Sequence, residues 1–170
     1  MNKENAQLDP ELQRQAMRSW TTGITIVTSK FGNAQQGMTV NSFTSVSLSP
    51  PVVSVSLAET TRTYGLVQQS NVFAVTILAD DQEELADRFA GRGYYEKLQD
   101  DDRFKGVKTF DLVTGSPLIT GGLAYLDCKV FHHLKVGETT VFFGEVVAAR
   151  HLENGKPLVY FNRLYRGLQI

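Results

Sequence analysis

The residues best suited to chemistry lie between positions 37 and 58, a stretch crowded with Ser, Thr and other small side chains. Its hydroxyls are interleaved with apolar residues that favour β-strands, as in Val53-Ser54-Val55-Ser56-Leu57. Short hydroxyls and a closely approaching backbone suit a flat, hydrogen-bonding heterocycle and a phosphate, because they donate hydrogen bonds while burying little charge. The alternative is a Ser/Thr-rich strand of an antiparallel sheet with solvated hydroxyls, and composition alone favours that alternative.

Other chemistries are excluded by motifs that the sequence lacks. Gly91-Arg92-Gly93 is not completed to G-x-G-x-x-G, and neither a Walker lysine loop nor a G-x-S-x-G elbow is present. His132 and His133 are adjacent, so a strand would point them to opposite faces, and no metal site is predicted. Cys128 lies on the apolar side of a strand-like alternation, which indicates a small core residue.

The composition predicts the setting of the protein. The 170 residues suit one domain over residues 1–170, with residues 1–8 expected to be flexible. A net charge of -1, from 17 basic and 18 acidic side chains, argues against a nucleic-acid partner. One cysteine excludes a disulfide scaffold. Because no segment approaches the roughly 20 apolar residues that span a bilayer, we expect a cytoplasmic protein without a membrane partner.

The elements that must position these residues are mostly strands. Alternating or continuous apolar patterns, separated by turn residues such as Phe31-Gly32-Asn33 and Asn154-Gly155, predict strands over residues 22–28, 38–43, 52–57, 72–78, 124–131, 139–150 and 158–161. The run over residues 72–78 is apolar throughout, which indicates a strand covered on both faces. These strands come as hairpins rather than in βαβ alternation, so we predict a mainly β fold, an antiparallel barrel with two or three helices.

Three segments predict helices. The first begins at Asp9-Pro10-Glu11, carries an apolar face through Leu12, Ala16 and Trp20, and ends before residue 23. The second covers residues 60–70 and is weakened by Gly65. The third is opened by a capping box over residues 80–83 and ended by the glycine at position 91. Residues 92–114, with an acidic cluster over residues 100–102, are expected to form a long surface excursion.

Blocks along nearly the whole chain resemble the short-chain flavin reductases, the small reductase components of two-component flavin-dependent monooxygenases. The matching blocks cover residues 37–58, 73–78, 82–91, 115–118, 124–128, 144–146 and 157–160. Each block alone is a weak signal, whereas their order from about Arg18 to Leu168 is specific.

The resemblance implies a split β-barrel of the FMN-binding type, usually a homodimer, which binds FMN or FAD and uses NADH or NADPH. It places a first group at the isoalloxazine edge, namely Thr39, Val40, Asn41 and Ser42 with Ser45 beside them. It places a second group around the ribityl chain and phosphate, namely Ser56, Leu57, Ala58, Arg62 and Thr63, with Arg88 and Phe89 closing the phosphate side. A simpler interpretation stays open for the last two, because Arg88 can pair with Glu84 and Phe89 can be core.

Two departures from the family pattern affect the nicotinamide side. The loop Gly137-Glu138-Thr139 lacks the histidine that many relatives carry, and residues 161–165 replace an aromatic-Arg-Gly pattern. Thr139 and Tyr165 are the candidates for nicotinamide contact. No catalytic residue is predicted, because the cofactors carry the chemistry of hydride transfer.

The resemblance thus implies an NAD(P)H-dependent flavin reductase that supplies reduced flavin to a partner monooxygenase. Two alternatives remain at this point. One is a non-catalytic flavin-binding or dimerisation module on the same barrel, since a fold does not fix a function. The other is a reductase of ferric complexes that holds its flavin tightly.

Overall fold

The computed structural model describes residues 8–98 and 103–169. Two sequence predictions therefore concern residues outside the described ranges: the flexibility expected of the first residues, apart from Leu8, and the acidic cluster over residues 100–102. The described helices are α1 (Pro10–Met17), α2 (Arg62–Ser70), α3 (Glu83–Ala90) and the 3-10 helix η1 (Gly93–Lys97). The strands are β1 (Thr22–Gly23), β2 (Thr25–Phe31), β3 (Ala34–Val40), β4 (Thr44–Leu48), β5 (Pro51–Ala58), β6 (Val72–Ile77), β7 (Thr109–Phe110), β8 (Leu118–Ile119), β9 (Ala124–Val136), β10 (Thr139–His151), β11 (Val159–Phe161) and β12 (Leu164–Arg166).

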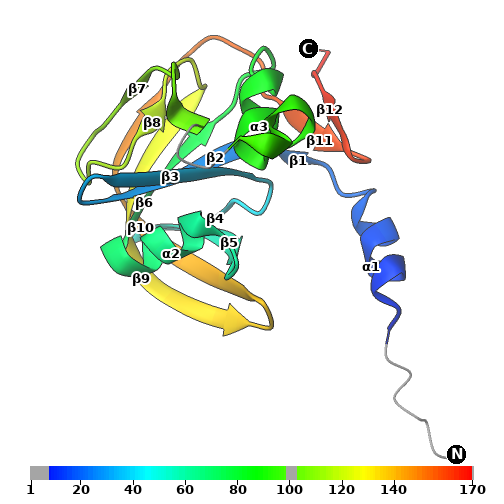
Figure 1. Ribbon diagram of the computed structural model, residues 1–170, viewed down its shortest axis with the longest axis horizontal. Helices are drawn as coiled ribbons and strands as arrows, with labels where there is room; N and C mark the ends of the chain where they lie inside the picture. The colour runs from blue at the N-terminus through cyan, green and yellow to red at the C-terminus, as the bar shows by residue number, and fades with distance from the viewer. Residues whose placement is uncertain (1–7, 99–102, 170) are drawn as a thin grey trace, which may run out of the picture.

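One antiparallel sheet forms the body of the molecule. Its strands are ordered β3-β2-β6-β9-β10-β5-β4, and a smaller sheet joins β1, β11 and β12 (Figure 1). The predicted β6 lies between β2 and β9 with its middle residues buried, as its unbroken apolar sequence requires. The long β9–β10 pair carries register shifts between Phe143 and Gly144 and between Val146 and Ala148, which bend the sheet. The predicted antiparallel, mainly β architecture is confirmed.

Two apolar clusters fill the fold. The larger packs β5, β6 and β10 together through buried side chains such as Val55, Phe73 and Phe142. The second packs α3 against β2 through the buried Phe89 and Ile26. Residues 92–114 are therefore not wholly a surface excursion, because the buried Phe104 meets Phe89 edge to face at a ring separation of 5.0 Å.

The helix boundaries follow local signals, with two corrections. α1 begins at the predicted Asp9 cap, but its apolar face does not pack: Leu12 is 55% exposed and Trp20 65% exposed, and the helix stands away from the sheet (Figure 1). The capping box predicted over residues 80–83 is wrong. Gln82 is the N-cap of α3, and its side chain instead accepts a hydrogen bond from the Ala79 amide and donates one to the Thr120 carbonyl. A neighbouring loop thus competes successfully for that side chain.

A substitution at Gly144 tests the packing between β10 and β6. A Cβ there would lie 2.6 Å from Phe73 Cε1 and 2.9 Å from Cys128 Cβ, in the fully buried core. We expect Gly144→Ala to lower the free energy of unfolding by about 2 kcal/mol through overpacking. Gly65→Ala is the matched control: a Cβ at that α2 position meets nothing within 4 Å, so it should stabilise by about 0.5–1 kcal/mol. Urea unfolding of both variants measures the difference, and equal effects would contradict the packing described.

Candidate functional site

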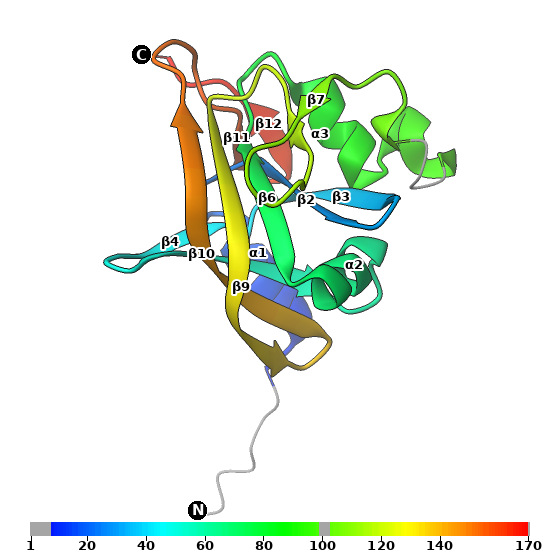
Figure 2. The same cartoon turned by 90° about the vertical axis from the view of Figure 1, so that its left-hand side faces the viewer.

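A cationic cavity lies between α2 and α3, beside β3. Both views place the two helices on the same side of the sheet with β3 between them (Figures 1 and 2). The cavity has a volume of about 460 Å³. It is lined by Met38, Thr39, Thr60, Thr61, Arg62, Thr63, Phe89, Ala90, Arg92 and Arg103. With three guanidinium groups and no carboxylate in this lining, the cavity suits an anion.

The start of α2 forms one wall of the cavity. The Thr61 hydroxyl accepts a hydrogen bond from the Tyr64 amide at 3.2 Å and donates one to the Ala58 carbonyl at 2.8 Å. This cap fixes the point where β5 ends and the helix begins. The first-turn amides of Arg62 and Thr63 lie at the positive end of the helix, which favours a negative charge in the cavity.

Two arginines of this cavity were not predicted from the sequence. Arg92 follows the glycine that ends α3, and its guanidinium lies 5.6 Å from the centre of the Tyr160 ring and donates to the Tyr160 hydroxyl at 3.4 Å. Arg103 donates to the Phe89 carbonyl at 3.0 Å. Both are distant in sequence from the Ser/Thr-rich stretch, so no local spacing signalled them; only the fold brings them to α2.

Arg88, which was expected at the phosphate side, lines a different cavity. Its guanidinium donates to the Lys105 carbonyl and lies 5.9 Å from the centre of the Tyr95 ring. Together with Lys108 and Gly121 it lines a groove of about 360 Å³. Its neighbour Phe89, in contrast, is fully buried in the core and lies at the wall of the cationic cavity.

A narrow crevice continues from the cavity toward the C-terminal hairpin. Its volume is about 70 Å³, and it is lined by Ile24, Thr39, Val40, Asn41, Ala90, Arg92, Tyr160 and Tyr165. Four predicted site residues meet here: Thr39 and Val40 from the end of β3, Asn41 directly after it, and Tyr165 from β12. The Thr39 hydroxyl donates to the Ala86 carbonyl at 2.7 Å, which ties β3 to α3 at the junction of cavity and crevice.

The remaining predicted residues lie around this junction with different environments. Ser42 Oγ accepts from the Ser56 amide and donates to the Ser56 carbonyl, both at 3.1 Å, so the two serines bind each other. Ser45 is exposed on β4, and Leu57 is fully buried in the core. The Ala58 carbonyl accepts hydrogen bonds from the amide and hydroxyl of Thr61, the N-cap of α2, and the half-buried Thr139 pairs with Ala58 across β5 and β10.

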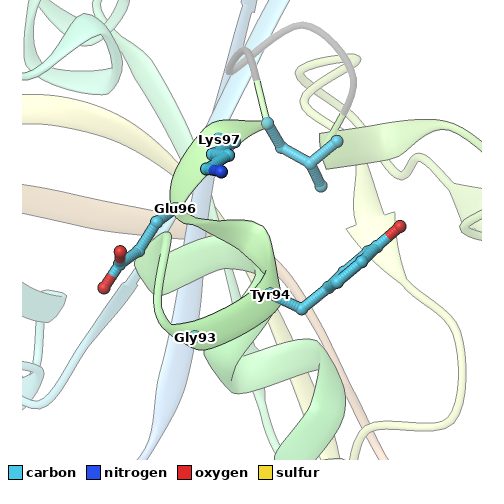
Figure 3. A pocket seen from close by; sticks show the side chains of 5 residues that line it. Gly93, Tyr94, Glu96 and Lys97 are labelled. Carbon is cyan, nitrogen blue, oxygen red and sulfur yellow. The ribbon is translucent and has the colours of Figure 1, made fainter.

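Other features of the described residues do not bring reactive side chains together in one place. A cavity of about 440 Å³ is formed by η1, where Figure 3 shows Tyr94 and Glu96 pointing in different directions, so its polar groups do not converge. Residues 8–98 and 103–169 hold no group of His, Cys, Asp and Glu side chains that could bind a metal, and no helix long and apolar enough to cross a membrane. Burial raises the pKa of the Cys128 thiol to about 12, in keeping with the predicted core role.

Comparison with known proteins adds the family. A family model described as the flavin reductase like domain matches residues 17–169. The chain belongs to the flavin reductase-like family. It is 30% identical over 162 residues to HsaB of Rhodococcus jostii, the reductase subunit of a flavin-dependent monooxygenase, covering 95% of this chain and 80% of the relative. It is 32% identical, over an alignment of 177 residues, to an NADH-dependent flavin reductase of Rhodococcus sp, covering 100% of this chain and 95% of the relative.

Solved structures agree with this flavin reductase-like assignment. The NADH:FAD oxidoreductase SgcE6 of Streptomyces globisporus superposes with a TM-score of 0.87 at 30% identity, covering 100% of this chain and 99% of that one. The expected split-barrel fold is thereby confirmed.

The phenol of Tyr165 gives this site a measurable pH dependence. Burial and, to a smaller extent, the Asp87 carboxylate raise its pKa to about 12. Because the folded state holds the proton more tightly than the unfolded state, Tyr165 stabilises the fold below pH 10 and loses that contribution as the pH rises from about 10 to 12. We expect Tyr165→Phe to lose less stability than wild type over this interval. Unfolding curves at several alkaline pH values measure it, and parallel losses in both proteins would contradict the burial of this hydroxyl.

Proposed function

We propose that this flavin reductase-like protein is an NAD(P)H:flavin oxidoreductase that passes hydride from the nicotinamide to FMN or FAD and supplies the reduced flavin to a separate monooxygenase. The observation that carries this function is the cationic cavity joined to a crevice, found in a chain of this family. The names of its relatives support both halves of the role, since one is an NADH-dependent flavin reductase and another is the reductase subunit of a flavin-dependent monooxygenase.

The residues present fit a flavin phosphate. Arg62, Arg92 and Arg103 bring three permanent positive charges to one cavity, and a guanidinium fork matches the oxygens of a phosphate. The hydroxyl of Thr63, buried at the first turn of α2, adds a hydrogen-bonding group. We assign the phosphate to this cavity, with Arg92 and Arg103 taking the role first expected of Arg88.

The ring end is then placed along the crevice, whose volume of about 70 Å³ admits an edge of the isoalloxazine rather than the whole ring. The flavin accepts a hydride directly from a stacked nicotinamide, so the reaction requires no acid, base or nucleophile from the protein. Thr39, Val40 and Asn41 hold and orient the isoalloxazine edge, and the hydrogen bond from Thr39 to α3 fixes the strand that carries them. Ser42 and Ser56 support the same region through the hydrogen bonds between them. Ser45 stays a candidate at the ring edge, and Ser56, Leu57 and Ala58 stay candidates around the ribityl chain. On the nicotinamide side we keep Tyr165, at the crevice, and Thr139 as candidates.

Replacing the cavity arginines tests the assignment of the phosphate. We expect Arg92→Ala and Arg103→Ala each to raise the KM for FMN by about tenfold, because a charge-assisted hydrogen bond contributes roughly 1.5–3 kcal/mol. Riboflavin lacks the phosphate, so its reduction should change little. NADH oxidation at 340 nm with FMN or riboflavin as acceptor gives both values. Arg150→Ala, an exposed arginine of β10 outside the cavity, is the matched control.

The variant Arg88→Ala separates the two possible phosphate sites. If it raises the KM for FMN while Arg92→Ala does not, the phosphate lies on the Arg88 side of α3. No oxidation of NADH or NADPH with any flavin by the wild-type protein would contradict the reductase function itself.

For the assembly we infer a homodimer in which a second copy of this chain covers the tip of the β9–β10 hairpin. Both views show this tip extending past α2 (Figures 1 and 2). Leu134 and Val136 lie on one face of it with 53% and 57% of their surfaces exposed, and Phe131 is 65% exposed. Exposed apolar side chains gathered on one hairpin are typical of a surface that another protein covers, so a second copy would bury them. The neighbouring segment Val141-Phe142-Phe143 is less available, because Phe142 is core.

Light scattering after size-exclusion chromatography tests the dimer. We expect twice the chain mass for wild type and a shift to monomer for Leu134→Glu, since a buried unpaired charge opposes association. Val113→Glu, at an exposed position of similar accessibility far from the hairpin in sequence, should remain dimeric. A monomeric wild-type protein would contradict the inference.

We also infer that the protein works in the cytoplasm, alongside the monooxygenase that uses its product. The reduced, buried thiol of Cys128 and the absence of a second cysteine support a reducing compartment. Fractionation that places the protein with the cell envelope would contradict this.

A further inference from the structure

We propose that a groove between α1 and the β11–β12 turn binds the ADP portion of a dinucleotide. The groove has a volume of about 210 Å³, and its lining includes Arg14, Arg18, Trp20, Tyr160 and Arg163. ADP is the portion that NADH, NADPH and FAD share. Only its assignment to these dinucleotides rests on the proposed function; the ADP site itself does not.

The groove is continuous with the site already described. Asn41 and Tyr160 line both the groove and the crevice, and Thr39 and Arg92 line both the crevice and the phosphate cavity. A single path therefore leads from the cationic cavity, along the end of β3, to the outer surface of α1. A ligand longer than a mononucleotide would extend along this path.

The side chains of the groove are those that recognise a nucleotide. The indole of Trp20 is 65% exposed and offers a flat surface on which a purine can stack. Three arginines line the same groove, and one carboxylate, that of Glu11, lies 3.3 Å from Arg14 and 3.6 Å from Arg18. A net positive charge thus remains for phosphate.

Two arginine side chains of the groove have donor groups without a partner among the described residues. Among residues 8–98 and 103–169, the Arg163 guanidinium has neither a hydrogen-bond nor an ion-pair partner, and the buried Nε of Arg18 has no hydrogen-bond partner. Arg163 is exposed, so its guanidinium is free to meet a ligand from solvent, whereas a buried donor such as Arg18 Nε is normally satisfied. A phosphate group in the groove would supply the acceptor.

The backbone that presents Arg163 is strained. Phe161 pairs with Leu164, so Asn162 and Arg163 alone form the turn, with φ values of 50° and 64°. Such a turn favours glycine at its second position because a Cβ is disfavoured in left-handed backbone. The Asn162 amide also donates to the Arg18 carbonyl at 3.1 Å, which holds the turn against the end of α1. An arginine held in a position suited to glycine points to a role for its side chain.

The test uses ADP itself and the single tryptophan of the chain as the reporter. We expect ADP to change the fluorescence of Trp20 in a saturable way, and Arg163→Gly to raise the Kd for ADP by about tenfold, as loss of one charge-assisted contact predicts. Because glycine suits the turn, the same variant should fold with an unchanged or higher Tm. A purely structural role for Arg163 would instead lower the Tm and leave the Kd for ADP unchanged.

Arg166→Ala is the matched control, since Arg166 is exposed on the same hairpin and does not line the groove. It should leave the Kd for ADP unchanged. No saturable response in wild type, or equal Kd values in wild type and Arg163→Gly, would overturn the proposal. Two further measurements with Arg163→Gly identify the dinucleotide that supplies the ADP group. A higher KM for NADH or NADPH, with FMN as acceptor, assigns the group to the nicotinamide dinucleotide. A higher Kd for FAD, with an unchanged Kd for FMN, assigns it to FAD. ADP binding by a protein that reduces no flavin would contradict only the reductase function.

Discussion

The contact between Phe89 of α3 and Gly37 of β3 is the constraint on which the site depends. A Cβ at Gly37 would lie 3.0 Å from the Phe89 ring, so the absence of a side chain there lets the helix approach the strand closely. Once Phe89 is buried, Thr39 can bind the Ala86 carbonyl and Arg103 can bind the Phe89 carbonyl. One apolar contact therefore sets the distance between α3 and the end of β3, and with it the shape of the cavity.

The three positive charges around this contact come from separate segments of the chain. Arg62 comes from the start of α2, Arg92 from the end of α3, and Arg103 from a segment that packs on Phe89 through Phe104. Because three guanidinium groups line one cavity, an anionic ligand there would interact favourably with all of them. The fold thus brings together, from three parts of the chain, the cationic groups to which we assign the flavin phosphate.

Much of the fold could be predicted from the sequence because its signals are local. The unbroken apolar run of β6, the turn at Gly32 and the cap at Asp9 each act over a few residues, and each is found in the structure. The hydrogen bond from the Gln82 side chain to Thr120 and the burial of Phe104 could not be predicted, because each depends on a partner distant in sequence. The same holds for the site: the hydroxyl-rich stretch was evident, whereas Arg92 and Arg103 gain their positions only through tertiary packing.

A crystal structure of the protein with FMN tests the central claim most directly, because it locates the phosphate. The account predicts that the phosphate oxygens lie within hydrogen-bonding distance of Arg92 or Arg103 and of the first turn of α2, with the ring directed toward Thr39 and Asn41. A phosphate beside Arg88 and Lys108, on the other side of α3, would contradict it.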